Sequence, residues 1–168
     1  MKSLKMHEFT LGSSNIGKAK ELNELLGDQF KIITPSEKLD VVEDADSFRA
    51  NALLKAKAYY EKFNKPALAD DSGLVVPTRA DILGIYSARF APEQTEYSGK
   101  MQKLIELMKN DTDRSAYFVC VLCFYLNPRE IFYFEGRLNG EIGHKMQGDG
   151  GFGYDPVFYP ENKDGESL

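Results

Sequence analysis

The chain has 168 residues, of which 42% are hydrophobic and 28% are charged, a balance that suits one compact domain with a substantial core. Its formal net charge of -5 argues against a protein that holds DNA or RNA on a broad basic surface. No apolar leader follows the first residues, and the longest apolar run, residues 116–126, is shorter than the roughly 20 residues that span a bilayer. We therefore expect a cytoplasmic protein with no membrane partner and no nucleic-acid partner.

Hydrophobic periodicity along the chain alternates between strand and helix patterns, which predicts a mixed α/β fold. Ser47 suits the N-cap of a helix, and Gly27 suits the end of another. In chain order, we expect a strand at 9–13, a helix at 17–26, a strand at 31–34, a helix from 47 to 63, a strand at 67–71, a helix at 97–109 and a strand pair at 116–126 and 131–138.

Two turn signals fall in the C-terminal half. Asn127-Pro128-Arg129-Glu130 favours the connection of a hairpin, and Asn139-Gly140 predicts a second turn. Cys120 and Cys123 have the C-x-x-C spacing of redox and zinc sites, but residues three apart on a strand face opposite sides. We therefore expect two buried core thiols, and the two distant histidines complete neither a zinc site nor a catalytic triad.

An apolar run leads directly into two adjacent carboxylates, Asp70 and Asp71, and then into Ser72 and Gly73. Successive strand residues point to opposite faces, so at most one of the two carboxylates faces a ligand while the strand stays regular. A buried carboxylate needs a cation or several donors, and Mg²⁺ prefers oxygen ligands. The segment predicts either a metal site or a strand that ends in an Asp-Asp-Ser-Gly turn.

The segment from Gly12 to Lys18 joins a strand to a helix, where free backbone N–H groups favour an anion and a lysine adds positive charge. It differs from the P-loop pattern at Ala19, which replaces the hydroxyl residue that binds Mg²⁺. A phosphate loop, a P-loop-like NTP hydrolase and an ordinary capped helix with a surface lysine all remain open from these residues.

A second glycine-rich loop covers residues 148–156 and contains four glycines and two aromatic residues. Glycine allows close backbone approach to a ligand, and an aromatic ring can stack on a base. The alternative is a flexible turn whose rings cover the core. Glu43, shortly before the Ser47 helix, either adds a carboxylate to the acidic site or belongs to a solvated acidic loop.

Five segments carry a pattern that goes beyond any one of them: SSNIGK at 13–18, SFRANALLKA at 47–56, PALADDSG at 66–73, GIYSAR at 84–89 and GGFGYDP at 150–156. Taken together, they resemble the inosine triphosphate pyrophosphatase family, also called Ham1-like, over nearly the whole chain. The resemblance implies an α/β fold with an elongated mixed β-sheet flanked by helices, in two lobes around a central cleft, and assembly as a homodimer. Residues 1–168 would form a single domain that lacks the C-terminal helix of the family, with its Lys and Ser-His-Arg segment.

The activity implied by this resemblance is Mg²⁺-dependent hydrolysis of noncanonical purine nucleoside triphosphates (ITP, dITP and XTP) to the monophosphate and pyrophosphate, which cleanses the nucleotide pool. Asp71 would be the catalytic general base and, with Glu43, a metal ligand, while Asp70 and Asn51 would support the site. Ala50 stands where most relatives have Glu, so a nucleotide-binding module with weakened catalysis is the alternative. The implied substrate-binding residues are Ser13, Ser14, Asn15, Ile16, Gly17, Lys18, Lys55, Ser72, Phe152, Gly153, Tyr154 and Asp155.

Overall fold

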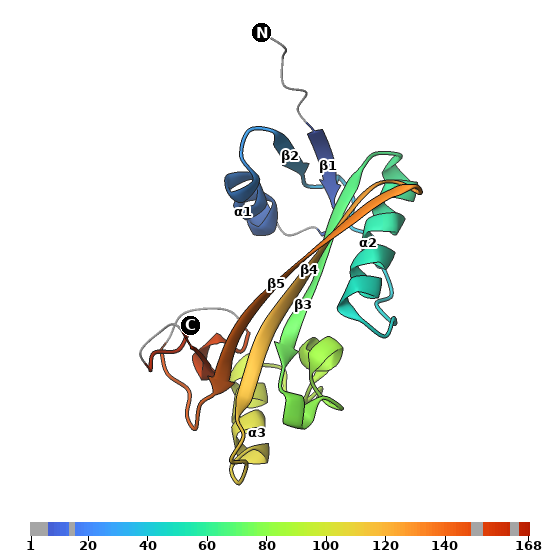
Figure 1. Cartoon of the computed structure of the whole chain (residues 1–168). Coiled ribbons are helices and arrows are strands. Elements are labelled where there is room, and N and C mark those ends of the chain that lie inside the picture. Colours follow the sequence, from blue (N-terminus) through green and yellow to red (C-terminus); the bar gives the residue numbers. More distant parts are fainter. Residues whose placement is uncertain (1–6, 14–15, 149–152, 162–164) are drawn as a thin grey trace. The chain divides into compact units, whose positions relative to one another are not determined.

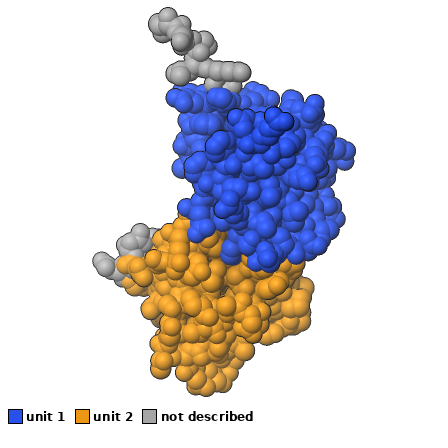
Figure 2. Space-filling view, turned by 45° about the vertical axis from the view of Figure 1, so that its right-hand side comes forward, with its two compact units in different colours: residues 1–71, 120–135 blue, residues 72–119, 136–168 orange. Residues whose placement is uncertain are grey.

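The computed structural model describes residues 7–13, 16–148, 153–161 and 165–168 (Figure 1). The chain folds into two compact units (Figure 2). Unit 1 comprises residues 1–71 and 120–135, and unit 2 comprises residues 72–119 and 136–168. Among the described residues, no helix combines the length and apolar character needed to cross a membrane.

Six strands of the described residues form one sheet in the order β2-β1-β3-β4-β5-β6. β1 pairs in parallel with both β2 and β3, whereas β5 and β6 pair in antiparallel fashion, so the predicted mixed sheet is confirmed. The strands are β1 (His7–Leu11), β2 (Phe30–Ile33), β3 (Ala67–Val75), β4 (Ser115–Asn127), β5 (Glu130–Ile142) and β6 (Phe158–Pro160). The helices are α1 (Ile16–Leu26), α2 (Phe48–Phe63) and α3 (Tyr97–Leu107), with short 3-10 helices η1 (Pro77–Arg79), η2 (Gly84–Arg89) and η3 (Asp155–Val157).

The core of unit 1 consists of two clusters that share β3 and β4 but use alternate residues of each strand. Leu68 and Phe124 pack in the cluster that contains Ala19 of α1, whereas the next residue of β3 and the preceding residue of β4, Ala69 and Cys123, pack in the cluster that contains α2. This alternation follows from the two-residue period of a strand. It places α1 and α2 on opposite sides of these strands (Figure 1).

Specific polar contacts fix the start of α2 and the loop before it. Ser47 is the N-cap and accepts a hydrogen bond of 3.3 Å from the Ala50 N–H, as its sequence position predicts. The side-chain oxygen of Asn51, which is buried, accepts from the Ala45 N–H at 3.0 Å. The Leu39 N–H donates to the Tyr59 hydroxyl, also at 3.0 Å. The segment that carries Glu43 is thus tied to α2 at two points.

Unit 2 has its own apolar core around Leu74, Leu104 and Phe158, and the side chain of Arg114 is buried in the same unit. Arg114 donates to the carbonyl oxygens of Ile142 at 2.6 Å, Gly143 at 2.7 Å and Met108. A buried cation is tolerated when its donors are satisfied in this way. Arg114 therefore links the end of α3 to the end of β5.

Two turn predictions are wrong. β3 continues through Asp70 and Asp71 to Val75, so these carboxylates lie in the middle of a strand and not at its end. Burial of Leu74 in the unit 2 core outweighs the turn tendency of the residues before it. Asn139 and Gly140 lie inside β5, where a Cβ atom on Gly140 would meet the Tyr159 carbonyl oxygen at 2.3 Å. That glycine permits the close approach of β6, a strand that was not predicted.

The thiol prediction is confirmed in part. Both cysteines are free, and Cys123 is fully buried in the unit 1 core, but Cys120 is only half-buried. Burial raises the pKa of the Cys123 thiol to about 11 and also raises the pKa of Cys120. Neither residue has the lowered pKa of a reactive thiol.

Candidate active site

Unit 1 contains a cavity of about 300 Å³ bounded by the turn after β1, the loop between β2 and α2, and side chains of α1, α2 and β3. Ser13 and the buried Tyr59 lie on its wall. Its charged lining consists of three lysines and three carboxylates, namely Lys18, Lys38, Lys55, Asp40, Glu43 and Asp70. An equal number of positive and negative side chains around one cavity is suited to a polyanion that binds together with a cation.

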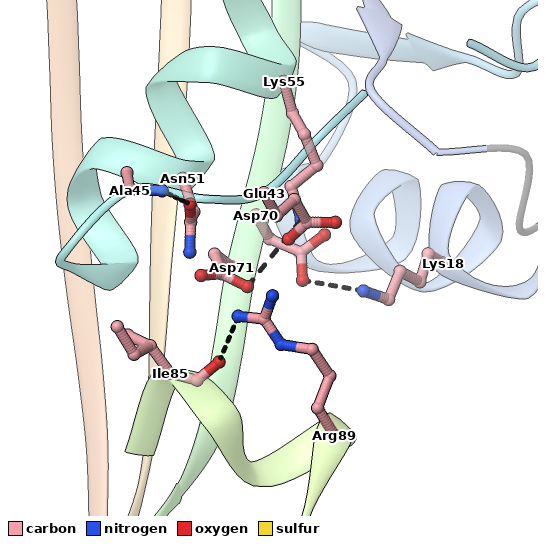
Figure 3. Close-up of polar contacts among 9 residues, drawn as sticks. All are labelled: Lys18, Glu43, Ala45, Asn51, Lys55, Asp70, Asp71, Ile85 and Arg89. Carbon is pink, nitrogen blue, oxygen red and sulfur yellow. Dashed lines mark hydrogen bonds and ion pairs between the residues drawn. The ribbon is translucent and has the colours of Figure 1, made fainter. Parts of the chain in front are cut away.

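The turn after β1 approaches β3 closely. A Cβ atom on Gly12 would lie 2.6 Å from the Cβ atom of Ala69, so a side chain at this position would collide with β3. Across the same approach, Lys18 of α1 forms an ion pair of 2.7 Å with Asp70 (Figure 3). Asp70 therefore belongs to the lining of the cavity and is the partner of the lysine that was expected to bind phosphate.

Lys55 of α2 connects two further carboxylates (Figure 3). Its Nζ atom lies 2.8 Å from Glu43 Oε2 and 3.8 Å from Asp71 Oδ1. The side chains of Lys55 and Asp71 are only 16% and 13% exposed, so solvent screens this pair less than a surface pair. Asp70 and Asp71, although adjacent on β3, are thus paired with lysines of different helices.

The same two carboxylates suit a magnesium ion. Glu43 and Asp71 lie 2.8 Å and 3.8 Å from the same ammonium nitrogen, so both carboxylates face one cationic group. No group of three metal-binding side chains occurs among the described residues. Proteins commonly hold Mg²⁺ through one or two carboxylates, with waters and substrate phosphates as the other ligands. The donor set therefore fits Mg²⁺ bound together with a phosphorylated substrate.

Unit 2 contains a second pocket, of about 400 Å³, whose lining is mainly aromatic and small. Within it, the Tyr154 hydroxyl donates to the Ser87 carbonyl oxygen at 2.8 Å, and the rings of Tyr154 and Tyr97 meet edge to face at 5.5 Å. Burial raises the pKa of Tyr154 well above its usual value, so its hydroxyl stays protonated and can donate. The buried Lys100 donates to the Ala88 carbonyl oxygen at 2.8 Å and so holds the adjoining residue of η2.

The structure brings together some of the predicted site residues and separates others. Ser13, Lys18, Glu43, Lys55 and Asp70 line the unit 1 cavity, with Asp71 in contact with Lys55. Ser72, Gly153, Tyr154 and Asp155 line the unit 2 pocket. Ile16 is 74% exposed at the start of α1, and neither it nor Gly17 is part of the cavity lining. Ser14, Asn15 and Phe152 lie outside the described residues.

Asn51 does not line the cavity. Its side-chain oxygen accepts a hydrogen bond from the Ala45 N–H, in the loop that carries Glu43. Tyr59 was not predicted from the sequence as a residue of the cavity. It follows Asn51 and Lys55 at intervals of four, so helical spacing could have identified it. Lys38 and Tyr97 were also missed. No motif surrounds Lys38, whereas the position of Tyr97 at the start of a helix gave no sign that its ring enters a pocket.

Comparisons with known proteins agree with this architecture. The family model described as "Ham1 family" matches residues 9–168. A dITP/XTP pyrophosphatase of Aquifex aeolicus is 40% identical, with 92% of this chain and 81% of the relative covered. One of Oceanobacillus iheyensis is 37% identical, with 95% and 84% covered.

Solved structures give the same result. The Staphylococcus aureus Ham1 protein is similar with a TM-score of 0.85 and 37% identity, covering 95% of this chain and 84% of that one. A HAM1 protein from Coxiella burnetii has the same TM-score and identity, covering 92% and 82%. The family model, the sequence identity and the fold agree, and the chain belongs to the Ham1 family.

Proposed function

We propose that this protein hydrolyses dITP, XTP and ITP to the nucleoside monophosphate and pyrophosphate, and thereby removes deaminated purines from the nucleotide pool. Relatives that are 37–40% identical are named dITP/XTP pyrophosphatases. The observation that carries the proposal is the contact of Lys55 with both Glu43 and Asp71 at a cavity lined by further lysines. Membership of the Ham1 family favours this activity over a P-loop-like hydrolase or a binding module without catalysis.

The proposed reaction adds water across the bridge between the α- and β-phosphates. The water oxygen bonds to phosphorus, its proton passes to the Asp71 carboxylate, and the bridging oxygen leaves with its electron pair on the departing product. Lys18 and Lys55 bind phosphate oxygens, which take the place of the Asp70 and Glu43 carboxylates as their ion-pair partners. Glu43 and Asp71 would hold Mg²⁺, which neutralises negative charge on the phosphate oxygens.

For the base, we propose the unit 2 pocket. Tyr97, Phe118 and Tyr154 supply aromatic surface there, which suits a flat purine ring. Gly153 lines the same pocket with a φ of +67°, a backbone conformation that other residues rarely take, so the shape of this wall depends on glycine. Ser72 and Asp155 add polar groups at the same pocket.

Replacement of Asp71 tests the proposed reaction. With Mg²⁺ and dITP, we expect Asp71→Asn to reduce pyrophosphate release by roughly 100-fold or more, because the amide cannot accept the proton of water. Asp28→Asn, at an exposed position of the same unit, is the matched control and should keep its activity. Orthophosphate as the first product of the unaltered protein would contradict the proposal.

We also propose a cytoplasmic homodimer, as the family resemblance implies. Unit 1 has an apolar groove that includes Phe124, Phe132 and Phe134, and the last two are 50% and 59% exposed. Each copy carries a net charge of -5, so an interface through uncharged surface avoids bringing like charges into direct contact. Among the described residues, the lining of this groove has no Asp, Glu, Lys or Arg, which favours a second copy as its occupant.

Sedimentation analysis tests this assembly. We expect a dimer for the unaltered protein and a monomer for Phe134→Glu, because the new carboxylate would be buried in the interface between the two copies. Glu135→Gln, which changes the neighbouring exposed residue of β5, should remain dimeric. A dimer that survives Phe134→Glu would show that the copies meet elsewhere.

A further inference from the structure

Lys38 differs from the other two lysines of the unit 1 cavity. Lys18 is paired with Asp70 at 2.7 Å, and Lys55 is paired with Glu43 at 2.8 Å. Lys38 lies in the loop between β2 and α2 and lines the same cavity, but within the described part of the chain it forms no hydrogen bond and no ion pair. It is therefore the one lysine of this lining, among the described residues, whose ammonium group is not held by a carboxylate.

The backbone beside Lys38 is held in place. The next residue, Leu39, donates its N–H to the hydroxyl of Tyr59, a side chain of α2 that is only 2% exposed. Both of these residues also line the cavity. A buried hydroxyl is a fixed anchor, so the main chain keeps Lys38 next to the cavity while its exposed side chain can still turn toward a ligand.

Ion pairing sets the relative cost of contacting each lysine. A phosphate that contacts Lys18 competes with Asp70 for the ammonium group, and one that contacts Lys55 competes with Glu43. Contact with Lys38 breaks no existing pair. An N–H donor of an ammonium group to a phosphate oxygen is a charge-assisted hydrogen bond, stronger than a neutral one.

We propose that Lys38 is a further substrate-binding residue, which contacts phosphate oxygens of the triphosphate. This inference rests on the proposed function for the identity of the substrate, but not for the binding of a polyphosphate. Lys38 contributes affinity for the phosphates and has no part in proton transfer, so the contribution is the same for every base. A loop lysine outside the recognised segments thus adds to the phosphate grip of this particular chain.

Kinetics of Lys38→Met test the inference with dITP and Mg²⁺. We expect the KM to rise about tenfold, the value of one charge-assisted hydrogen bond, with kcat within about twofold. The dependence of KM on salt concentration should also weaken. Lys31→Met is the matched control, an exposed lysine of β2 that is not part of the cavity lining, and should leave KM unchanged. Lys38→Arg should restore a KM close to that of the unaltered protein.

Calorimetry with inorganic tripolyphosphate separates this inference from the proposed function. If dITP releases no pyrophosphate but Lys38→Met still binds tripolyphosphate about tenfold more weakly than Lys31→Met does, the proposed reaction fails and the role of Lys38 stands. If pyrophosphate is released and both lysine variants keep the same KM and tripolyphosphate Kd, the role of Lys38 is refuted. A fall in kcat with unchanged KM would also overturn it.

Discussion

The cavity of unit 1 and the pocket of unit 2 are built from opposite kinds of contact. In unit 1, Lys18 and Lys55 are held by carboxylates through ion pairs whose side chains are partly exposed. In unit 2, the Tyr154 ring is buried and its hydroxyl is bonded to a main-chain oxygen. The charged groups of a ligand can take the place of one partner in an ion pair. A buried ring cannot be displaced in this way unless the wall of the pocket unfolds locally.

This difference leads to a general expectation. Side-chain changes at the cavity should alter binding and catalysis more than folding stability, since partly exposed ion pairs contribute little to stability. Changes at the pocket should alter stability directly, because they remove buried contacts. Four measurements test or refine this contrast.

The largest effect is expected for Lys55→Met. The substitution removes a phosphate-binding cation and leaves Glu43 and Asp71 without their shared partner. We expect kcat/KM for dITP to fall roughly 100-fold, with a smaller effect on the thermal midpoint, which falls because the Asp71 side chain is only 13% exposed and loses a partner. Lys57→Met, on the exposed side of the same helix, controls for loss of a lysine. Equal activity of the two variants would contradict the contrast.

Gly12→Ala is the exception within unit 1, because it acts on the backbone and not on a charge. The added methyl group would lie 2.6 Å from the Ala69 Cβ atom. We expect the free energy of unfolding to fall by about 2 kcal/mol through overpacking, measured by denaturant titration. Gly136→Ala is the control, since a Cβ atom there meets nothing within 4 Å. Similar losses in both variants would show that the turn can move away from β3.

Tyr154→Phe measures the pocket of unit 2. Loss of the hydroxyl leaves the Ser87 carbonyl oxygen without this donor, so we expect a loss of about 1 kcal/mol in the free energy of unfolding. Tyr86→Phe, at a side chain that is 47% exposed, should be close to neutral. A stable Tyr154→Phe protein with greatly reduced activity would mean that the hydroxyl serves the ligand and not the wall.

The smallest effect concerns Cys123, which lies in the apolar interior of unit 1. Burial raises its pKa from an ordinary value of 9.0 to about 11, so the native thiol stays neutral at pH 8. Because the folded state favours the protonated form, this contribution to stability is complete below about pH 8.5 and is lost as the pH rises toward 11. In a Cys120→Ser background, we expect slow thiol labelling at pH 8 that becomes fast on unfolding. Rapid labelling of the native protein would indicate an open interior.

Local features of this fold were predictable, and contacts between distant segments were not. Ser47 caps α2, and that helix ends at Phe63 as predicted, because a capping side chain and helical spacing act over a few residues. The Lys18–Asp70 pair joins residues 52 positions apart, and no local pattern contains that information. The extent of β3 was wrong for a related reason. Turn tendency is local, whereas the burial of Leu74 depends on a core that assembles from several elements.

Pairing between Lys18 and Asp70 and between Lys55 and Glu43 has a consequence for competition in the cell. An anion that arrives alone, such as orthophosphate, would displace carboxylates and leave them next to its own negative charge. A nucleotide that arrives with a divalent cation offers the displaced carboxylates a new partner. The acidic side chains would thus weaken the binding of anions that arrive without a cation. Abundant free phosphate would therefore compete poorly with a scarce nucleotide.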